Sequence, residues 1–322
     1  MKLAVIYHYY EKDEIYKDNL VFFLSAALHE DVHYFIYISG TCSANLPKRP
    51  NLHYKKIENK NNDFGGVVAF FNDPRSKGYD AYIFVNSSMR GPFLPTYHQD
   101  RWYAPYTARL TDKVALVGSS INHLPSDAPH SALFAQDYGI TPPFTHVQTT
   151  AYALSGKGAR YLYDKGFFSE PQHLGKHDVV SRYEILLSQL LLQGGFEIAA
   201  LLPTYTRFSG TNAEPPYLGT LEDGDPLFAN AFYGRTLSPL ESLFVKTNRN
   251  MIAERELASY TFTALASKEP ESLTPDGAKL RDLSHRKAIA KPPNPIISAI
   301  RQELATLRKR ARKLRKRLRL AK

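Results

Sequence analysis

The stretch YDAYIFV (79–85), followed by the polar triplet NSS (86–88), decides the fold of this chain. Its aromatic and β-branched residues predict a buried strand, and the triplet ends it. Working outward, the patterns predict strands at 3–9, 32–38, 52–58 and 114–117, and helices at 19–29, 64–71 and 180–193. Such an alternation predicts an α/β fold with a parallel or mixed sheet flanked by helices. Ligands bind beyond the carboxyl ends of the strands in these sheets, so we expect the site after residue 85.

Composition excludes several classes of protein. The 322 residues are 43% hydrophobic and 22% charged, which is ordinary for a globular chain. A single cysteine, Cys42, excludes an intrachain disulfide and any CxxC site. No apolar run reaches the roughly 18 residues of a spanning helix, and the apolar start of the chain is too short for a signal peptide. We therefore expect a cytoplasmic protein.

The net charge of +10 resides entirely in the C-terminal tail. Residues 301–322 hold eleven Lys or Arg and one Glu, which gives +10. The other 300 residues hold 30 basic (41 − 11) and 30 acidic (31 − 1) side chains and sum to zero. A basic chain usually suggests nucleic-acid binding, but the body of this chain gives that reading no support, so we expect no specific nucleic-acid partner.

The C-terminal region predicts a linker and a basic amphipathic helix. Residues 266–295 are polar and contain prolines, as in a linker, and residues 296–322 place apolar residues at heptad spacing among basic ones. A coiled-coil dimer, an acidic protein partner, nucleic acid and disorder are the alternatives. We expect the helix to bind an anionic membrane surface on the inner face of the cell membrane. The expected contacts are Arg308, Lys309, Arg312, Lys313, Arg315 and Lys316.

Common catalytic motifs are absent from the sequence. It contains no GxGxxG, GxxxxGK[ST], HExxH or GxSxG pattern. His173 and His177 have the spacing of two metal ligands on one helix, but Gly175 and Pro171 argue against a helix there. A solvent-facing loop is the favoured interpretation of this pair.

Several segments of the sequence together form a distinctive pattern. The most specific is NSSMRGPFLP (86–95), which begins with the strand-end motif (Asn86-Ser87-Ser88). The other segments are ENKNNDFGG (58–66), VGSSIN (117–122), HVQTT (146–150), YEILLS (183–188) and the closing motif FVKTNR (244–249). Together they resemble glycosyltransferases of the GT-A type, in particular family 2-like and rhamnan-synthesis proteins of polysaccharide biosynthesis. The resemblance spans residues 1–260 and implies a GT-A, Rossmann-like domain over residues 1–265. It also implies transfer of a hexose or deoxyhexose from a nucleotide-sugar to a glycan or lipid-linked glycan acceptor of lipopolysaccharide or capsule.

Two positions depart from the pattern of these glycosyltransferases. Asn61 replaces the usual glycine, and asparagine tolerates a left-handed backbone better than most residues. The strand-end motif occupies the place of the metal-binding D-x-D, yet it offers only neutral oxygens. We therefore expect no metal cofactor, with Mg²⁺ or Mn²⁺ as the alternative. Fixed basic side chains would then neutralise the diphosphate. Arg90 is one candidate, with a surface ion pair as its alternative, and Lys246 and Arg249 are the others.

The resemblance assigns further residues to the donor side of the site. Asp63 would help to seat the nucleoside, and it is also a candidate N-cap for the helix at 64–71. Asn59 would contact the base or hold its loop. Asn86 and Ser88 belong to the donor site through the strand-end motif.

A carboxylate is expected as the base that deprotonates the acceptor in an inverting reaction. Glu184 is the first candidate, because it begins an otherwise apolar helix, where a carboxylate is costly without a task or a partner. A capping or ion-paired role is its alternative. Asp178 is the second candidate, with a surface loop as its alternative.

Three residues are expected on the acceptor side. His146 and Gln148 line it by resemblance, although a structural histidine is the alternative. Trp102 could stack on a sugar face, with core packing as its alternative. For the whole chain, the competing hypothesis is an inactive glycosyltransferase-like module that the tail recruits to a membrane or partner.

Overall fold

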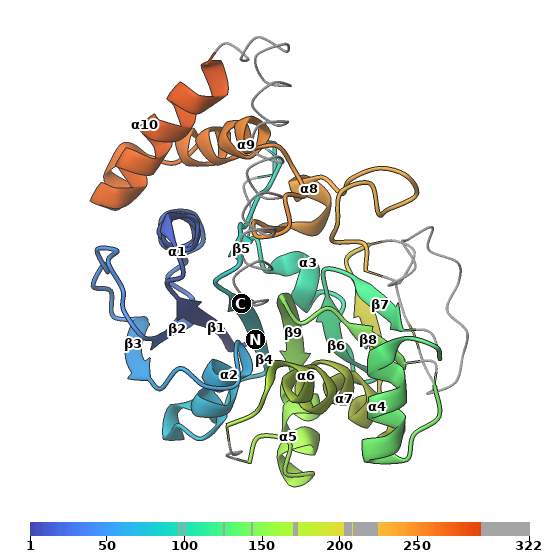
Figure 1. Ribbon diagram of the computed structural model, residues 1–322. Coiled ribbons are helices and arrows are strands. Elements are labelled where there is room, and N and C mark those ends of the chain that lie inside the picture. The colour runs from blue at the N-terminus through green and yellow to red at the C-terminus, as the bar shows by residue number, and fades with distance from the viewer. Residues whose placement is uncertain are drawn as a thin grey trace, which may run out of the picture.

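The computed structural model shows a β-sheet that is flanked by helices (Figure 1). The structure describes residues 1–95, 97–98, 101–124, 126–142, 144–169, 173–202, 208 and 225–290. Within these residues the central sheet has seven strands in the order β10-β6-β9-β4-β1-β2-β3. They are β1 (Leu3–Tyr10), β2 (Val32–Ser39), β3 (Leu52–Ile57), β4 (Ala81–Asn86), β6 (Val114–Gly118), β9 (Ala151–Ser155) and β10 (Glu197–Ala200).

Strand β9 is antiparallel to both of its neighbours, β4 and β6, whereas the other neighbouring strands pair in parallel. The sheet is therefore mixed and mainly parallel, which confirms the predicted fold class. The carboxyl ends of β1 and β4 lie together, because His8 is in register with Asn86. The strand-end motif thus starts at the edge of the sheet where a ligand is expected.

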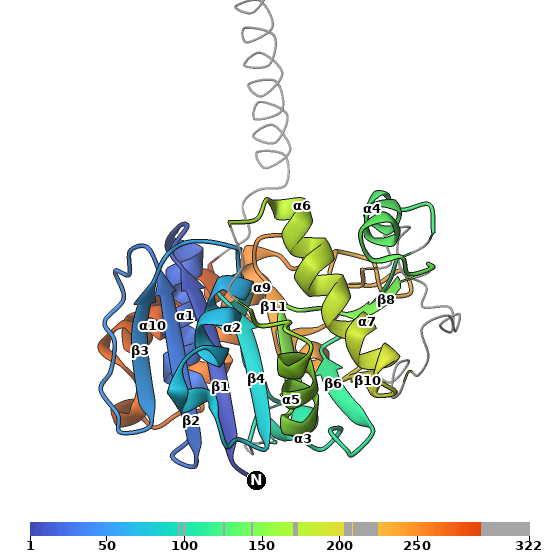
Figure 2. The same cartoon turned by 90° about the horizontal axis from the view of Figure 1, so that it is seen from below.

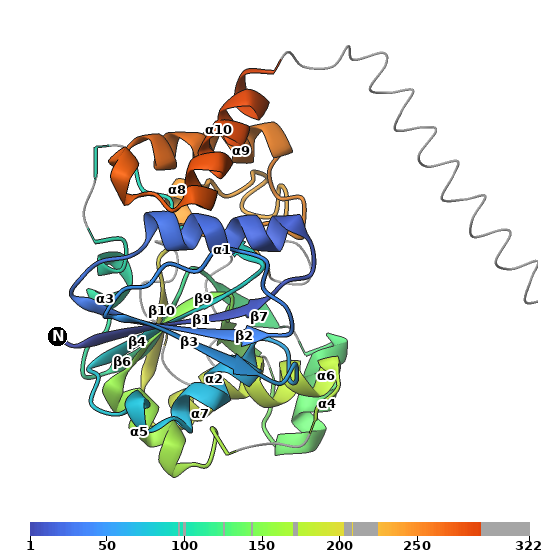
Figure 3. The same ribbon diagram turned by 90° about the vertical axis from the view of Figure 1, so that its left-hand side faces the viewer.

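Helices cover both faces of the sheet. Helix α1 (Glu14–Ala26) lies on one face, with α9 (Glu254–Ala266) and α10 (Pro275–Ile289) stacked beyond it (Figure 3). Helices α2 (Phe64–Phe71), α5 (Gly156–Asp164) and α7 (Leu186–Gln193) cover the other face (Figure 2). The remaining short elements are α3 (Ala104–Thr107), α4 (Pro129–Tyr138), α6 (Lys176–Val179), α8 (Pro239–Ser242), the 3₁₀ turns Pro74–Ser76 and Pro270–Ser272, and a π-helical segment, Val180–Ile185.

Burial on both faces explains the continuous apolar character of β1. Leu3, Val5 and Tyr7 pack into the core under α1, whereas Ala4 and Ile6 pack into the core on the α2 side. Side chains alternate between the faces of a strand, so a strand covered on both sides needs apolar residues at every position.

Two small sheets carry the site-forming loops. Strands β5 (Met89–Arg90) and β11 (Val245–Lys246) pair in antiparallel fashion, as do β7 (Ile121–Leu124) and β8 (Phe144–Val147). The β5–β11 pair brings the closing motif back onto the segment that follows the strand-end motif.

The region predicted as a linker contains a packed helix. Helix α10 begins after Thr274, whose hydroxyl accepts from the Gly277 backbone N–H, and Leu280 is buried against the core. Gly277 allows α10 to lie close to α1, because a Cβ there would be 2.1 Å from Ser25 Oγ. The polar composition of this segment is typical of a linker, whereas its Thr-Pro start is typical of a helix.

The rest of the predicted linker and the whole predicted basic helix, with its six expected membrane contacts, lie outside the described residues. No helix in the part of the chain that the structure describes is long and apolar enough to cross a membrane.

Candidate functional site

The strand-end motif is held together by the side chain of Asn86. Its Oδ1 accepts hydrogen bonds from Ser88 N at 3.1 Å and Ser88 Oγ at 2.6 Å. Its Nδ2 donates to Asp63 Oδ2 at 2.6 Å. Asn86 and Ser88 are buried, so these contacts are shielded from water. The fold therefore brings three predicted donor-side residues together.

Asp63 does not cap helix α2. Its backbone is already helical and its side chain makes no capping hydrogen bond, because the carboxylate turns toward Asn86. Burial raises the pKa of Asp63, and the nearby His8 and Lys246 act in the opposite direction. The capping interpretation is thus wrong, and the Asp63 carboxylate bonds to the strand-end motif instead.

The loop before Asp63 has the left-handed turn that the sequence predicts. Asn61 and Asn62 have φ angles of 55° and 49°, and the Asn61 side chain accepts from Leu174 N at 2.8 Å. Asn59 is exposed in this loop. Gly66 lets α2 approach β1, because a Cβ there would lie 2.9 Å from the Cβ of His8.

The closing motif supplies two cations to this edge of the sheet. Lys246 lies on β11, and burial lowers its pKa, as does the neighbouring Arg249. Arg249 forms an ion pair with Asp225 and lies over the ring of Phe228, 4.1 Å from its centroid. These contacts keep Arg249 beside Lys246.

Glu184 faces the same group of charges. It lies in the π-helical segment Val180–Ile185, a rare geometry that is frequent at functional sites. Burial raises the pKa of Glu184 to about 7, while Lys246 lowers it and Asp63 raises it further. The helix that follows is tied to β8 by Ser188, whose Oγ accepts from Val147 N at 2.9 Å. A carboxyl group whose pKa lies near neutral pH can accept and release a proton in catalysis.

Asp178 lies elsewhere. It is exposed on α6 and does not belong to the charges that shift the pKa of Glu184. The geometry therefore favours Glu184 over Asp178 as the base.

The predicted acceptor-side residues divide into two groups. Gln148 donates to Asp225 at 2.7 Å, and His146 is buried next to it on β8, where burial lowers its pKa to about 4. Trp102 instead lies in the core on the α1 side, 1% exposed, and donates to Ala27 O at 2.8 Å. A side chain so enclosed cannot stack on a sugar, so core packing is the correct interpretation of Trp102.

Arg90 lines a cavity with Lys246 but is held by other partners. It is 5% exposed beneath α1, where it contacts Asn19 and Asp18. The expectation that it binds the diphosphate overlooked these partners, which lie about 70 residues away in the chain.

Three residues of this edge were not singled out from the sequence. Asp225 links Gln148 to Arg249, and His8 lies beside Asp63 with its Nε2 2.5 Å from Ser39 Oγ. The buried hydroxyl of Tyr152, which lines a small cavity with His8 and Asp63, has no hydrogen-bond partner in the described part of the chain. The position of His8 at the end of β1 was an available signal; Asp225 lies in a segment without a helix or strand pattern.

One carboxylate at this edge is available for a metal ion that is shared with a ligand. Among the described residues there is no group of three or more His, Cys, Asp or Glu side chains that could hold an ion. Asp63 nevertheless places a carboxylate beside the strand-end motif, where it accepts from Asn86 Nδ2, while Asn86 Oδ1 accepts from Ser88 Oγ. Mg²⁺ commonly binds through one or two carboxylates together with substrate phosphates, and Asp63 meets that requirement.

Comparison with solved structures returns glycosyltransferases, the class that the sequence resemblance indicates. One is the mannosyltransferase PcManGT from Pyrobaculum calidifontis, with 11% identity over 95% of this chain and 80% of that one, at a TM-score of 0.35. Another is S. aureus TarS 1–349, with 7% identity, 89% and 71% coverage and a TM-score of 0.36. The galactosyltransferase LgtC has 10% identity, 61% and 73% coverage and a TM-score of 0.34. No protein-family model and no curated protein sequence matches this chain.

One of these structures contradicts the expectation that no cofactor is involved. The mannosyltransferase was solved in complex with GDP-Man and Mn²⁺. The expectation considered only the neutral triplet at 86–88, whereas folding adds the carboxylate of Asp63, which is more than 20 residues away in sequence. The absence of a metal is therefore withdrawn.

Proposed function

We propose that this chain is a glycosyltransferase that transfers a sugar from a nucleotide-sugar donor to a glycan acceptor. The observation that carries the proposal is the placement of Glu184, whose pKa is about 7, among the cations Lys246 and Arg249. Displacement of a nucleoside diphosphate needs a base for the incoming hydroxyl and positive charge for the leaving group. Both requirements are met at one edge of the sheet, together with the segments that resemble glycosyltransferases.

In the proposed inverting reaction, Glu184 takes the proton of an acceptor hydroxyl. The acceptor oxygen forms a bond to the anomeric carbon while the bond from that carbon to the diphosphate oxygen breaks. The nucleoside diphosphate leaves with the electron pair, and Lys246 and Arg249 stabilise its negative charge. A divalent ion bound at Asp63 would supply further charge neutralisation.

The donor and acceptor are assigned to the two sides of this cluster. Asp63, Asn86 and Ser88 hold the donor, since they form one hydrogen-bonded unit at the ends of β1 and β4. His146 and Gln148 lie toward the acceptor, and Asp225 fixes Gln148 in place. A hexose or deoxyhexose for a cell-surface polysaccharide remains the favoured substrate, by the resemblance of the sequence.

The test is a donor screen with the full-length protein. UDP-, GDP- and dTDP-sugars are incubated with Mn²⁺ or Mg²⁺, and release of nucleoside diphosphate is measured with and without a glycan acceptor. We expect one donor to be turned over and the Glu184→Gln variant to lose turnover while it retains nucleotide binding. Asp164→Asn, at an exposed site on α5, is the control. Nucleotide binding without turnover of any donor would instead support the inactive module.

A further inference from the structure

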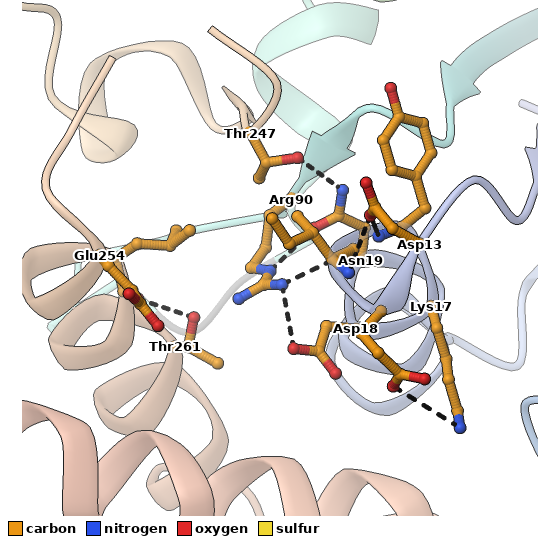
Figure 4. Close-up of polar contacts among 12 residues, drawn as sticks. Asp13, Lys17, Asp18, Asn19, Arg90, Thr247, Glu254 and Thr261 are labelled. Atoms are coloured by element: carbon orange, nitrogen blue, oxygen red, sulfur yellow. Dashed lines mark hydrogen bonds and ion pairs between the residues drawn. The ribbon is translucent and has the colours of Figure 1, made fainter. Parts of the chain in front are cut away.

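Helix α1 is joined to the donor side by a buried polar network (Figure 4). Arg90 donates through Nε to Asn19 Oδ1 at 2.9 Å, and its guanidinium lies 3.6 Å from Asp18 Oδ2. In the close-up, Asp18 and Asn19 point from α1 toward Arg90. Both partners belong to one helix, so the arginine fastens α1 to β5.

The Asn19 side chain uses its amide in two directions. While Oδ1 accepts from Arg90, Nδ2 donates to Ser87 O and to Thr247 Oγ1, each at 2.9 Å. Asn19 is fully buried. A buried amide must find partners for both its donor and its acceptor, and here the partners come from the strand-end motif, β5 and the closing motif.

These contacts continue to the residues assigned to the donor. Thr247 N and Thr247 Oγ1 donate to Ser88 O at 2.9 and 3.0 Å. Ser88 in turn donates to Asn86, and Asn86 donates to Asp63. Lys246 immediately precedes Thr247. The Asn19 amide is therefore connected, through these hydrogen bonds, to the Asp63 carboxylate and to the segment that carries Lys246.

We infer that Asn19 is a positioning residue, which sets the strand-end motif against the closing motif so that Asp63 and Lys246 are placed for the nucleotide donor. The inference rests on the proposed function. The two motifs are about 160 residues apart and bond directly through Ser88 O, and the Asn19 amide adds a third anchor because it donates to both. Small errors in the placement of binding groups have large effects on catalysis.

Asn19→Asp is the decisive variant. Its carboxylate keeps an acceptor for Arg90 Nε but has no N–H for Ser87 O or Thr247 Oγ1. We expect the protein to fold, and the Kd of the released nucleoside diphosphate, measured by titration calorimetry, to rise at least tenfold. Amide hydrogen exchange in 86–90 and 245–249 should become at least tenfold faster.

Ser25→Ala is the matched control, on the same helix. Ser25 is also buried, and its hydroxyl contacts Val21 O and Thr274 on the side of α1 that faces α10. This variant should lower the melting temperature without changing nucleotide affinity. Unchanged affinity in Asn19→Asp, or equal losses in the two variants, overturns the inference. If the native protein binds no nucleotide, the proposed function fails, and unchanged exchange in the two segments of Asn19→Asp would then refute the positioning role independently.

Discussion

Asp63 accepts a hydrogen bond of 2.6 Å from the side chain of Asn86, across 23 residues of sequence. This contact places a carboxylate at the strand end, where the sequence alone presents only neutral oxygens. Burial favours the protonated form of Asp63, whereas His8, Lys246 and the amide of Asn86 favour the ionised form. The ionisation of Asp63 is thus set by its burial and by groups from three other segments.

Replacement of Asn86 by Asp should make stability depend on pH and on metal. Two carboxylates would then lie within hydrogen-bond distance, and one of them must bind a proton unless a cation separates them. We expect the melting temperature of Asn86→Asp, relative to the native protein, to fall by several degrees between pH 5 and pH 8. Mn²⁺ should restore it. Scanning calorimetry at both pH values checks this, and a constant difference would contradict it.

Removal of the carboxylate should weaken the response of the donor site to metal. If Asp63 and the donor phosphates share a divalent ion, Mn²⁺ will tighten binding of the nucleoside diphosphate to the native protein. We expect Asp63→Asn to lose most of that effect, with at least a tenfold weaker affinity in saturating Mn²⁺. Calorimetric titrations with Mn²⁺ and with EDTA give the comparison. Equal responses of the two proteins would remove Asp63 from the metal site.

Glu184→Gln should abolish transfer while it preserves donor binding. Loss of a general base typically costs about 100- to 10,000-fold in rate. In the native protein the base is active when ionised, so kcat should rise with pH through about 7, the pKa of Glu184. The residual rate of the variant should lack this dependence. Normal transfer by Glu184→Gln together with loss in Asp178→Asn would exchange the two roles.

The same substitution should stabilise the protein in alkaline solution. The pKa of Glu184 is raised from 4.5 to about 7 by folding, so the folded state binds the proton more tightly than the unfolded state. Stability from this group is therefore lost as pH rises from about 4.5 to about 7. Gln mimics the protonated acid, so the variant should melt above the native protein at pH 8 and close to it at pH 4. A lower melting temperature at pH 8 would show that ionised Glu184 is favourable in the fold.

The central strands of the sheet could be predicted from the sequence, because strands that are buried on both faces consist of continuous apolar runs. The strands at the centre are enclosed on both faces, and their apolar runs ended within one or two residues of the observed β1, β2, β3 and β4. Helix α10 was missed because its face toward α1 and α9 is narrow, with Leu280 and small residues between charged ones. A short apolar stripe of this kind is hard to distinguish from a polar linker.

The site was predictable where motif and topology agree. Asn86, Asp63 and Glu184 converge at the edge where parallel strands end, as expected. Arg90 and Trp102 are instead held by α1 and by Ala27, which follows it, and pairing between distant segments leaves no local pattern. Asp225 was missed for the same reason: its partners Gln148 and Arg249 are 77 and 24 residues away.

Removal of the tail should abolish binding to anionic membranes. Residues 301–322 carry a net charge of +10, and each Lys or Arg near an anionic surface contributes about 1 kcal/mol. Helix α10 ends at Ile289, so a chain that stops at Lys291 keeps the whole described fold. Full-length protein should sediment with phosphatidylglycerol vesicles, dissociate in high salt and fail to bind phosphatidylcholine vesicles, while the shortened chain stays in solution.

Replacing Arg308, Lys309, Arg312 and Lys313 by Gln provides the matched test, because it lowers the charge by four and preserves the apolar spacing. If this variant binds as well as the native protein, apolar insertion rather than charge holds the tail; if the shortened chain also binds, the anchor lies elsewhere.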